Sequence, residues 1–158
     1  MKNLKKALLA AVAATVLANG AFAATATNQF QARIEIQADC EVTSPTTLDF
    51  GTSGLLNANV DASSTFNVKC TNGVGYTISL GNGANASGTQ NRMENNGEFV
   101  NYETYSDSAR TQVWDASSTV AGTGTGADQS YTVYGRVPPQ NTPSVGTFTD
   151  TVTITVTY

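Results

Sequence analysis

The sequence predicts an all-β protein in which two sheets pack face to face as a β-sandwich. Apolar and polar side chains alternate in several short runs, which is the period of a strand with one buried face. Turn residues separate these runs, and no helical period occurs after the first segment of the chain. A β-barrel is the second choice for the same pattern.

The longest uninterrupted alternation, here called the N-terminal ribbon, is Asn28–Val42. Its apolar members are every second residue: Phe30, Ala32, Ile34, Ile36, Ala38, Cys40 and Val42. No Gly or Pro interrupts it. Such a ribbon is not stable alone, because its apolar face and both of its backbone edges need a sheet. The functional question is therefore which sheet receives it.

Six further strand-like runs follow Cys40. They are 46–52, 65–70, 76–80, 100–105, 131–137 and 148–158. The stretches 53–64, 81–97 and 121–127 are rich in Gly, Asn and Ser and are expected to be loops. With the ribbon the count is seven strands, as in a complete immunoglobulin-like domain. Two alternatives remain open: the ribbon completes its own domain, or the domain is one strand short and the ribbon completes a neighbour.

Residues 1–23 have the features of a secretory signal peptide. Lys2, Lys5 and Lys6 precede an apolar run at Ala7–Leu17, which is too short to span a bilayer. The small-x-small triplet Ala21–Ala23 follows as a cleavage site. Export to an oxidising compartment is therefore expected.

The two cysteines, Cys40 and Cys70, are expected to form one disulfide in an exported protein. Their spacing excludes a CxxC redox site. The chain has no histidine to complete a two-thiol metal site, so no metal or cofactor is expected.

Composition argues against several classes of function. The 158 residues carry a formal net charge of −4 without a basic patch, which disfavours nucleic acid and anionic lipid as partners. The absence of histidine excludes Ser-His-Asp and Cys-His catalysis. Four neighbouring acids, Glu94, Glu98, Glu103 and Asp107, suit solvated loops better than a glycosidase pair. Trp114 suits packing better than sugar stacking. The sequence therefore predicts neither an enzyme nor a small-molecule substrate.

Four motifs together resemble the spore coat protein U domain family, which includes the pilins of archaic, Csu-type chaperone–usher pili. They are CEV at Cys40, LDFGT at Leu48–Thr52, YSDSARTQVW at Tyr105–Trp114, and YTVYGRVPPQNTPSVGTFTDTVTITVTY at Tyr131–Tyr158. The last motif is the most distinctive, and the resemblance covers essentially the whole chain after the signal peptide.

The resemblance implies an incomplete immunoglobulin-like domain at 39–158, preceded by a donor strand at 24–38. A periplasmic chaperone lends a strand during export, and an outer-membrane usher exchanges it for the donor strand of the next identical or related subunit. The product is a cell-surface pilus that supports adhesion or biofilm formation. A self-contained secreted coat protein, or a small carbohydrate-binding module of the same fold, is the alternative.

The same resemblance assigns site residues. The donor-strand residues that fill the neighbour's groove are Phe30, Ala32, Ile34, Ile36 and Ala38. The acceptor groove lies between the run around Leu48 and Phe50 and the last strand, with Val152, Ile154, Val156 and Tyr158. Strand addition of this kind gains affinity from main-chain hydrogen bonds and register from alternating pockets.

Overall fold

The computed structural model describes residues 23–158, so the expected signal peptide lies outside the described residues except for Ala23. The chain divides into two units, Met1–Ile34 and Glu35–Tyr158. In the first unit, residues 23–34 form no helix or strand, and the side chains of Phe30 and Ile34 are exposed. Among the described residues, no helix is long and apolar enough to cross a membrane.

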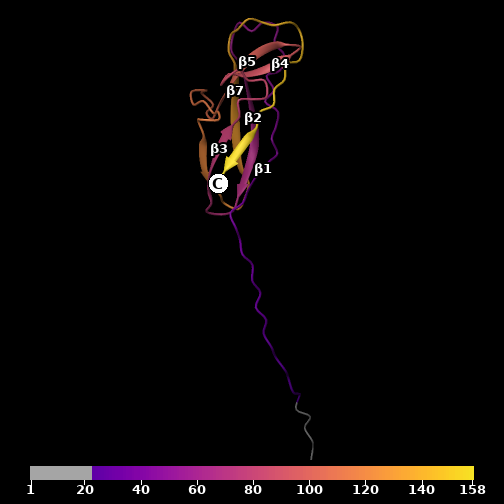
Figure 1. Ribbon diagram of the computed structural model, residues 1–158, viewed down its shortest axis with the longest axis vertical. Helices are drawn as coiled ribbons and strands as arrows, with labels where there is room; N and C mark the ends of the chain where they lie inside the picture. The colour runs from indigo at the N-terminus through magenta and orange to yellow at the C-terminus, as the bar shows by residue number, and fades with distance from the viewer. Residues whose placement is uncertain (1–22) are drawn as a thin grey trace, which may run out of the picture. The chain divides into compact units, whose positions relative to one another are not determined.

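The second unit is an all-β domain of two antiparallel sheets, which confirms the predicted fold class (Figure 1). The first sheet has the order β1-β2-β7-β5-β4, and the second has the order β6-β3-β8. The strands are β1 (Cys40–Thr43), β2 (Val60–Cys70), β3 (Gly75–Leu80), β4 (Asn91–Asn95), β5 (Glu98–Tyr105), β6 (Val120–Thr123), β7 (Gln129–Val137) and β8 (Ile154–Thr157).

The longest ladder joins β2 to β7, from Val60 opposite Val137 to Val68 opposite Gln129. Alternate residues of β2 point inward, so that Phe66, Val68 and Cys70 are buried. They meet the buried side chains of β3 and form the larger of two apolar clusters. This cluster joins the two sheets, because its members come from both of them.

Trp114 lies in this larger cluster and is only 1% exposed. Its ring is tilted against that of Phe66 and meets that of Tyr131 edge to face, and its Nε1 donates a hydrogen bond of 3.0 Å to the carbonyl of Ile78. Both the ring and its polar atom are therefore satisfied inside the protein. The prediction of a packing role is confirmed, and no Trp114 face is available for a sugar.

The second cluster is less well covered. Only Val100, Tyr102 and Val137 are fully buried in it, and the apolar side chains around them are half-exposed. The surrounding side chains are Leu48, Phe50, Leu56, Val60, Met93, Phe148 and Val152. A closed sandwich would cover such side chains, so this part of the domain is where a covering element is absent among the described residues.

Several expected strand boundaries are wrong. Strand β2 begins at Val60, inside the expected loop 53–64. Strand β4 lies in the expected loop 81–97, and all of β6 except Val120 lies in the expected loop 121–127. The runs 46–52 and 148–153 are not strands, although alternate side chains from Phe148 to Val156 are half-buried as the pattern predicts. The ribbon is a strand only at its last three residues, Cys40–Val42, which belong to β1 and pair with β2.

Candidate functional site

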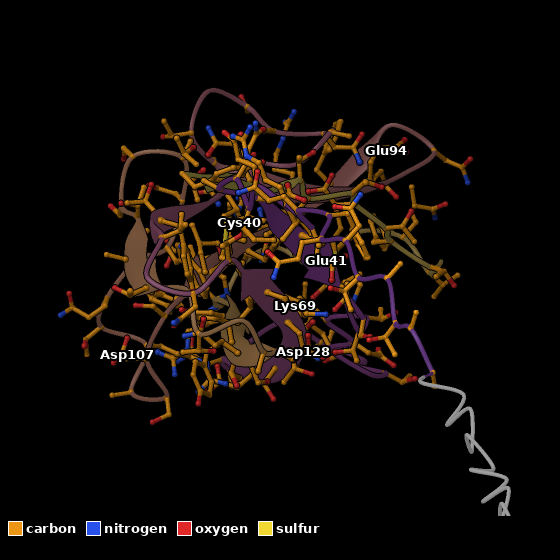
Figure 2. The ribbon with its side chains drawn as sticks, turned by 90° about the horizontal axis from the view of Figure 1, so that it is seen from below. Cys40, Glu41, Lys69, Glu94, Asp107 and Asp128 are labelled. Carbon is orange, nitrogen blue, oxygen red and sulfur yellow. A yellow bond between two sulfur atoms is a disulfide. The ribbon has the colours of Figure 1, made fainter. Side chains whose placement is uncertain are left out.

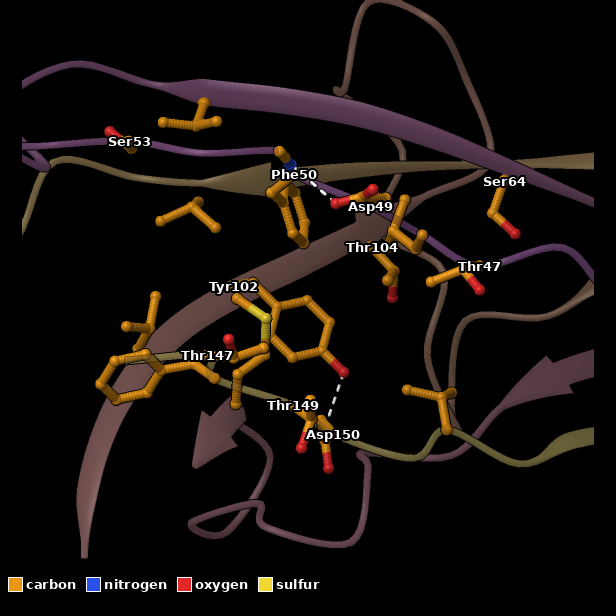
Figure 3. Close-up of a pocket in the computed structure, with 18 of the residues that line it drawn as sticks. Thr47, Asp49, Phe50, Ser53, Ser64, Tyr102, Thr104, Thr147, Thr149 and Asp150 are labelled. Atoms are coloured by element: carbon orange, nitrogen blue, oxygen red, sulfur yellow. Dashed lines mark hydrogen bonds between the residues drawn. The ribbon is translucent and has the colours of Figure 1, made fainter. Parts of the chain in front are cut away.

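A groove of about 980 Å³ opens over the second cluster (Figure 3). Its first wall is residues 47–50 and its second wall is residues 148–154. Its floor includes Val100, Tyr102 and Val137. Leu48 and Phe50 of the first wall and Phe148 and Val152 of the second wall are apolar and line the groove, so it is suited to apolar side chains.

The first wall has a free backbone. Thr46 begins the segment with a 2.8 Å hydrogen bond from its N–H to the carbonyl of Thr65. Residues 47–50 then form no backbone–backbone hydrogen bond with any other described residue. Such a row of unpaired N–H and C=O groups is a template for another strand.

The second wall uses only one of its two edges. Its odd-numbered residues bond away from the groove: the carbonyls of Thr151 and Thr153 accept from Ala84 and Gly81, and Thr149 exchanges two hydrogen bonds with Glu94. The intervening residues Asp150 and Val152 form no backbone–backbone hydrogen bond with other described residues. Because successive residues of an extended chain bond to opposite sides, these free groups face the groove.

The two walls run in opposite directions along the groove. Thr46 lies beside Thr65, while Leu56 accepts a hydrogen bond from Gln140 beyond the other end of β7. The second wall runs the other way, because Ile154 pairs with Leu80 in the larger cluster and Phe148 packs in the smaller one. A single extended segment between the walls would therefore meet a free backbone edge on both sides.

Four of the six residues assigned to the acceptor groove line it: Leu48, Phe50, Val152 and Ile154. Val156 and Tyr158 do not, and Tyr158 donates from its hydroxyl to Asp39 Oδ1 at 3.2 Å. Sequence reasoning missed Tyr102 and Asp150, which also line the groove. The signal for Asp150 is present in the sequence, because it occupies an inward-facing position between Phe148 and Val152.

Asp150 is the charged group of the second wall. Its Oδ2 accepts a 2.7 Å hydrogen bond from the Tyr102 hydroxyl, and its Oδ1 accepts from the backbone N and the Nδ2 of Asn85 at 3.1 and 3.3 Å. Burial and this carboxylate raise the pKa of the Tyr102 hydroxyl far above its usual value. Gly83 makes room, since a Cβ there would lie 1.9 Å from Asp150 Oδ2. The carboxylate is thus fixed in one place (Figure 3).

The residues assigned to the donor strand are exposed. Phe30, Ile34 and Ile36 are 93%, 82% and 70% exposed, although large apolar side chains are usually buried. Ala32 and Ala38 are exposed as well. An apolar face of this length without cover in the described structure is a candidate interaction surface.

The C-terminal end of this segment, here called its root, is held to the domain by hydrogen bonds to Thr71. The N–H of Thr71 donates a 2.9 Å hydrogen bond to the carbonyl of Asp39. Its hydroxyl donates a 3.1 Å hydrogen bond to the carbonyl of Gln37. The N–H of Asp39 donates to Thr71 Oγ1 at 3.1 Å. Ala38 therefore lies between two residues that are anchored to β2's end.

Cys40 and Cys70 form the expected disulfide, 30 residues apart. The bond joins directly paired residues of β1 and β2, so it fixes the edge strand from which the N-terminal segment leaves. Glu41 and Lys69, on the neighbouring rung, form an exposed ion pair at 3.7 Å (Figure 2). Only the disulfide is a strong constraint, because exposed ion pairs contribute little.

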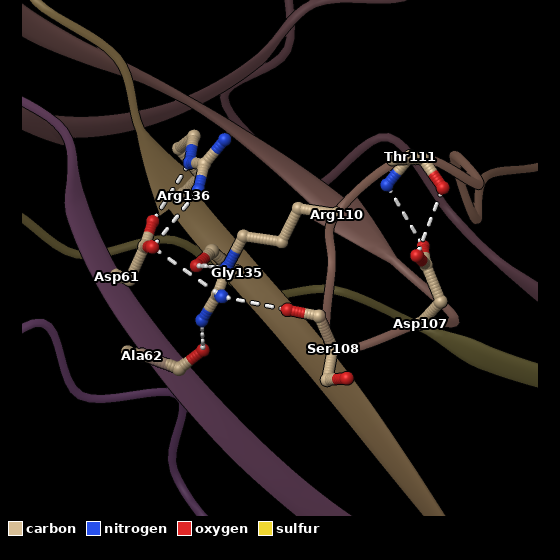
Figure 4. Close-up of polar contacts among 8 residues, drawn as sticks. All are labelled: Asp61, Ala62, Asp107, Ser108, Arg110, Thr111, Gly135 and Arg136. Carbon is tan, nitrogen blue, oxygen red and sulfur yellow. Dashed lines mark hydrogen bonds and ion pairs between the residues drawn. The ribbon is translucent and has the colours of Figure 1, made fainter.

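A polar cluster of Asp61, Arg110 and Arg136 lies on the outer face of the first sheet (Figure 4). Arg136 donates to both carboxylate oxygens of Asp61 at 2.8 and 2.9 Å, and this contact lowers the pKa of Asp61. Arg110 donates to the carbonyls of Gly135 and Ala62 at 3.0 and 3.1 Å. These groups satisfy each other and hold β2 to β7, so the cluster is structural.

Each of the four neighbouring acids accepts a hydrogen bond within the domain. Glu94 accepts from the N–H of Gly97, Glu98 from that of Ser144, and Asp107 from those of Thr111 and Gln112. Glu103 accepts from the hydroxyl of Tyr105. Glu94, Glu103 and Asp107 thus bond to residues close by in the sequence, while Glu98 joins β5 to the loop that contains Ser144. Among residues 23–158, no group of three or more metal-ligating side chains is clustered.

Comparison with known proteins shows the family to which the chain belongs. The family model described as Spore Coat Protein U domain matches residues 26–155. The chain therefore belongs to the spore coat protein U domain family. Among individual proteins it is similar to Protein U of Myxococcus xanthus. The two are 32% identical over an alignment of 183 residues, which covers the whole of both chains.

The fold also resembles a solved structure. A chain in the crystal structure of the CsuC–CsuE chaperone–tip adhesion subunit pre-assembly complex, from archaic chaperone–usher Csu pili of Acinetobacter baumannii, superposes with a TM-score of 0.59. The two chains are 23% identical, and the match covers 78% of this chain and 40% of the other. This likeness concerns the fold.

Proposed function

We propose that this protein is a structural subunit of a chaperone–usher surface fibre that polymerises by donor-strand exchange. The observation that carries the proposal is the groove, whose two walls present unpaired backbone edges over an apolar floor. The chain also carries an exposed segment with the strand period and the apolar face that the groove requires.

The donor strand in this proposal spans 24–38, and the domain 39–158 receives the corresponding strand of another subunit. Insertion buries Phe30, Ile34 and Ile36, which contributes on the order of 5–8 kcal/mol before the cost of ordering the segment. Main-chain hydrogen bonds along both walls add to this. Their slow cooperative rupture matters more for the durability of a fibre than equilibrium affinity does.

The partners follow from the same geometry. An empty groove with free strand edges is an aggregation hazard, so the subunit needs a periplasmic chaperone that covers the groove during export. An outer-membrane usher then replaces the chaperone with the next subunit. Family membership and the likeness to a chain from a Csu pilus complex support this assignment. The fibre reaches the cell surface, where it supports adhesion or biofilm formation.

A self-contained coat protein is the second candidate, and the family's description as a spore coat domain favours it. In that case the ribbon would occupy the groove of its own chain. The two candidates differ in whether the apolar residues of the ribbon are needed for the domain to fold or for subunits to join.

Ile34→Asp distinguishes them, because it places an unpaired carboxylate in the groove that receives the ribbon. For a fibre subunit we expect normal export and a normal chaperone complex, but no addition to surface fibres. For a self-contained protein the monomer yield should collapse. Gln31→Asp is the matched control, since Gln31 lies on the opposite face of the ribbon, and it should assemble normally. Loss of the chaperone complex with Ile34→Asp would overturn the proposal.

A further inference from the structure

We propose that Asp150 sets the register of the incoming strand by accepting Ala32 of the neighbouring subunit opposite it. This inference rests on the proposed function and adds which residues meet. The second wall directs Phe148, Asp150, Val152 and Ile154 inward, and three of these four are apolar. Asp150 is therefore the one charged position among the inward-facing residues of the second wall, and its neighbours on that face are apolar.

The carboxylate cannot move aside cheaply. It holds three hydrogen bonds, one from Tyr102 and two from Asn85, and Figure 3 shows it pointing at the Tyr102 hydroxyl. A large aliphatic side chain opposite it would strip water from a charged group without offering a hydrogen bond. Among apolar side chains, the methyl group of alanine covers the smallest part of the Asp150 carboxylate. The donor residue that faces Asp150 should therefore be an alanine.

The ribbon offers two alanines on its apolar face, and the structure selects Ala32. Ala38 lies between Gln37 and Asp39, whose backbone groups are bonded to Thr71 of their own domain. It is therefore held at the root of the segment. Ala32 is six residues further out, or about 20 Å of extended chain, and can enter another subunit.

This register also suits the large residues. If the strand runs antiparallel to the second wall, Phe30 faces Val152 and Ile34 faces Phe148. If it runs parallel, Phe30 faces Phe148 and Ile34 faces Val152. In both directions the two large side chains flank Asp150 and meet apolar residues that line the groove. A shift by two residues in either direction would put Phe30 or Ile34 on the carboxylate.

Cysteine cross-linking reads the register in assembled fibres. Positions 31 and 33 of the donor flank Ala32, and Thr149 and Thr151 flank Asp150 on the exposed side of the wall. We expect Gln31→Cys and Arg33→Cys each to form intersubunit disulfides with a cysteine at one of these two threonines, seen as ladders on non-reducing denaturing gels. Directly opposite residues in adjacent strands are close enough for this bond. Single-cysteine variants serve as controls.

Cross-links to a cysteine at Thr147 or Thr153 instead would place another residue opposite Asp150 and overturn the register. If the chains form no fibres at all, the proposed function fails, which is a different result. Assembled fibres without any of these cross-links would count against the register alone.

A pair of substitutions tests the role of the charge. Ala32→Ile should lower fibre yield about tenfold or more, because it overpacks the position and desolvates the carboxylate. Ala38→Ile, at the anchored root of the ribbon, is the comparison variant and should lower fibre yield far less. Combining Ala32→Ile with Asp150→Ala should restore part of the yield, which a merely structural role of Asp150 would not produce. No rescue, together with equal losses for both alanine variants, would contradict the proposal.

Discussion

Gly135 of β7 lies directly beneath Leu48 of the first wall, so close that a Cβ at Gly135 would be 2.7 Å from Leu48 Cδ2. The same atom would be 2.9 Å from Cζ of Phe50. Glycine at this position thus lets both wall side chains rest on the sheet. The spacing of the groove depends on this contact.

Gly135→Ala should push Leu48 and Phe50 toward the groove. We expect a loss of about 1–3 kcal/mol in the free energy of unfolding, and a larger fractional loss in subunit assembly. Urea unfolding and fibre yield measure the two effects. Gly75→Ala is the control, because nothing lies within 4 Å of its added Cβ. Equal behaviour of the two variants would show that the contact is unimportant.

Arg110 adopts a left-handed backbone conformation, with φ of 57°. Its guanidinium forms hydrogen bonds to the first sheet. It donates to carbonyls of two strands and pairs with Asp61 at 3.3 Å (Figure 4). Arg110→Lys loses the planar fork and should lower the free energy of unfolding by about 1–3 kcal/mol. Lys69→Gln, which breaks only an exposed pair, should change it by less than about 0.5 kcal/mol. Thermal unfolding of both variants checks the contrast.

The strands that carry their own alternation were predictable from the sequence. β3, β7 and the second half of β2 each bury residues at every second position, and so does the first part of β5 with Val100 and Tyr102. β4 was missed because Met93 is its one strongly apolar residue, so its pairing with β5 creates the strand. β6 was missed because its sequence, with Gly122, resembles a loop until β3 pairs with it.

The groove was predictable only in part. Leu48, Phe50 and Val152 belong to alternating runs, and the family resemblance indicated which runs face each other. The hydrogen bond between Tyr102 and Asp150 was not predictable, because the two residues are 48 positions apart and Asp150 lies outside any strand. Whether a run such as 46–52 finds a hydrogen-bond partner is a property of the whole fold, which alternation alone does not encode.

Tyr105 should titrate late. Burial and the hydrogen bond to Glu103 raise the pKa of its hydroxyl to about 12. A raised pKa favours the neutral form in the folded state, so this contribution to stability is complete below the unfolded value of about 10 and is lost as the pH rises toward 12. Near-ultraviolet absorbance titration of wild type and Tyr105→Phe isolates its transition. A difference curve centred near pH 10 in the folded protein would contradict the expectation.

The disulfide should account for a large part of the stability of the domain. Cys40 and Cys70 close a loop of 30 residues, for which the chain-entropy model gives about 3–4 kcal/mol. The bond also holds β1, a four-residue edge strand that pairs only with β2 among the described residues. We expect the double variant with Cys40→Ala and Cys70→Ala to unfold at a lower urea concentration. Adding reductant should shift wild type toward the variant and leave the variant unchanged. Overlapping unfolding curves for oxidised and reduced wild type would show that strand pairing alone is sufficient.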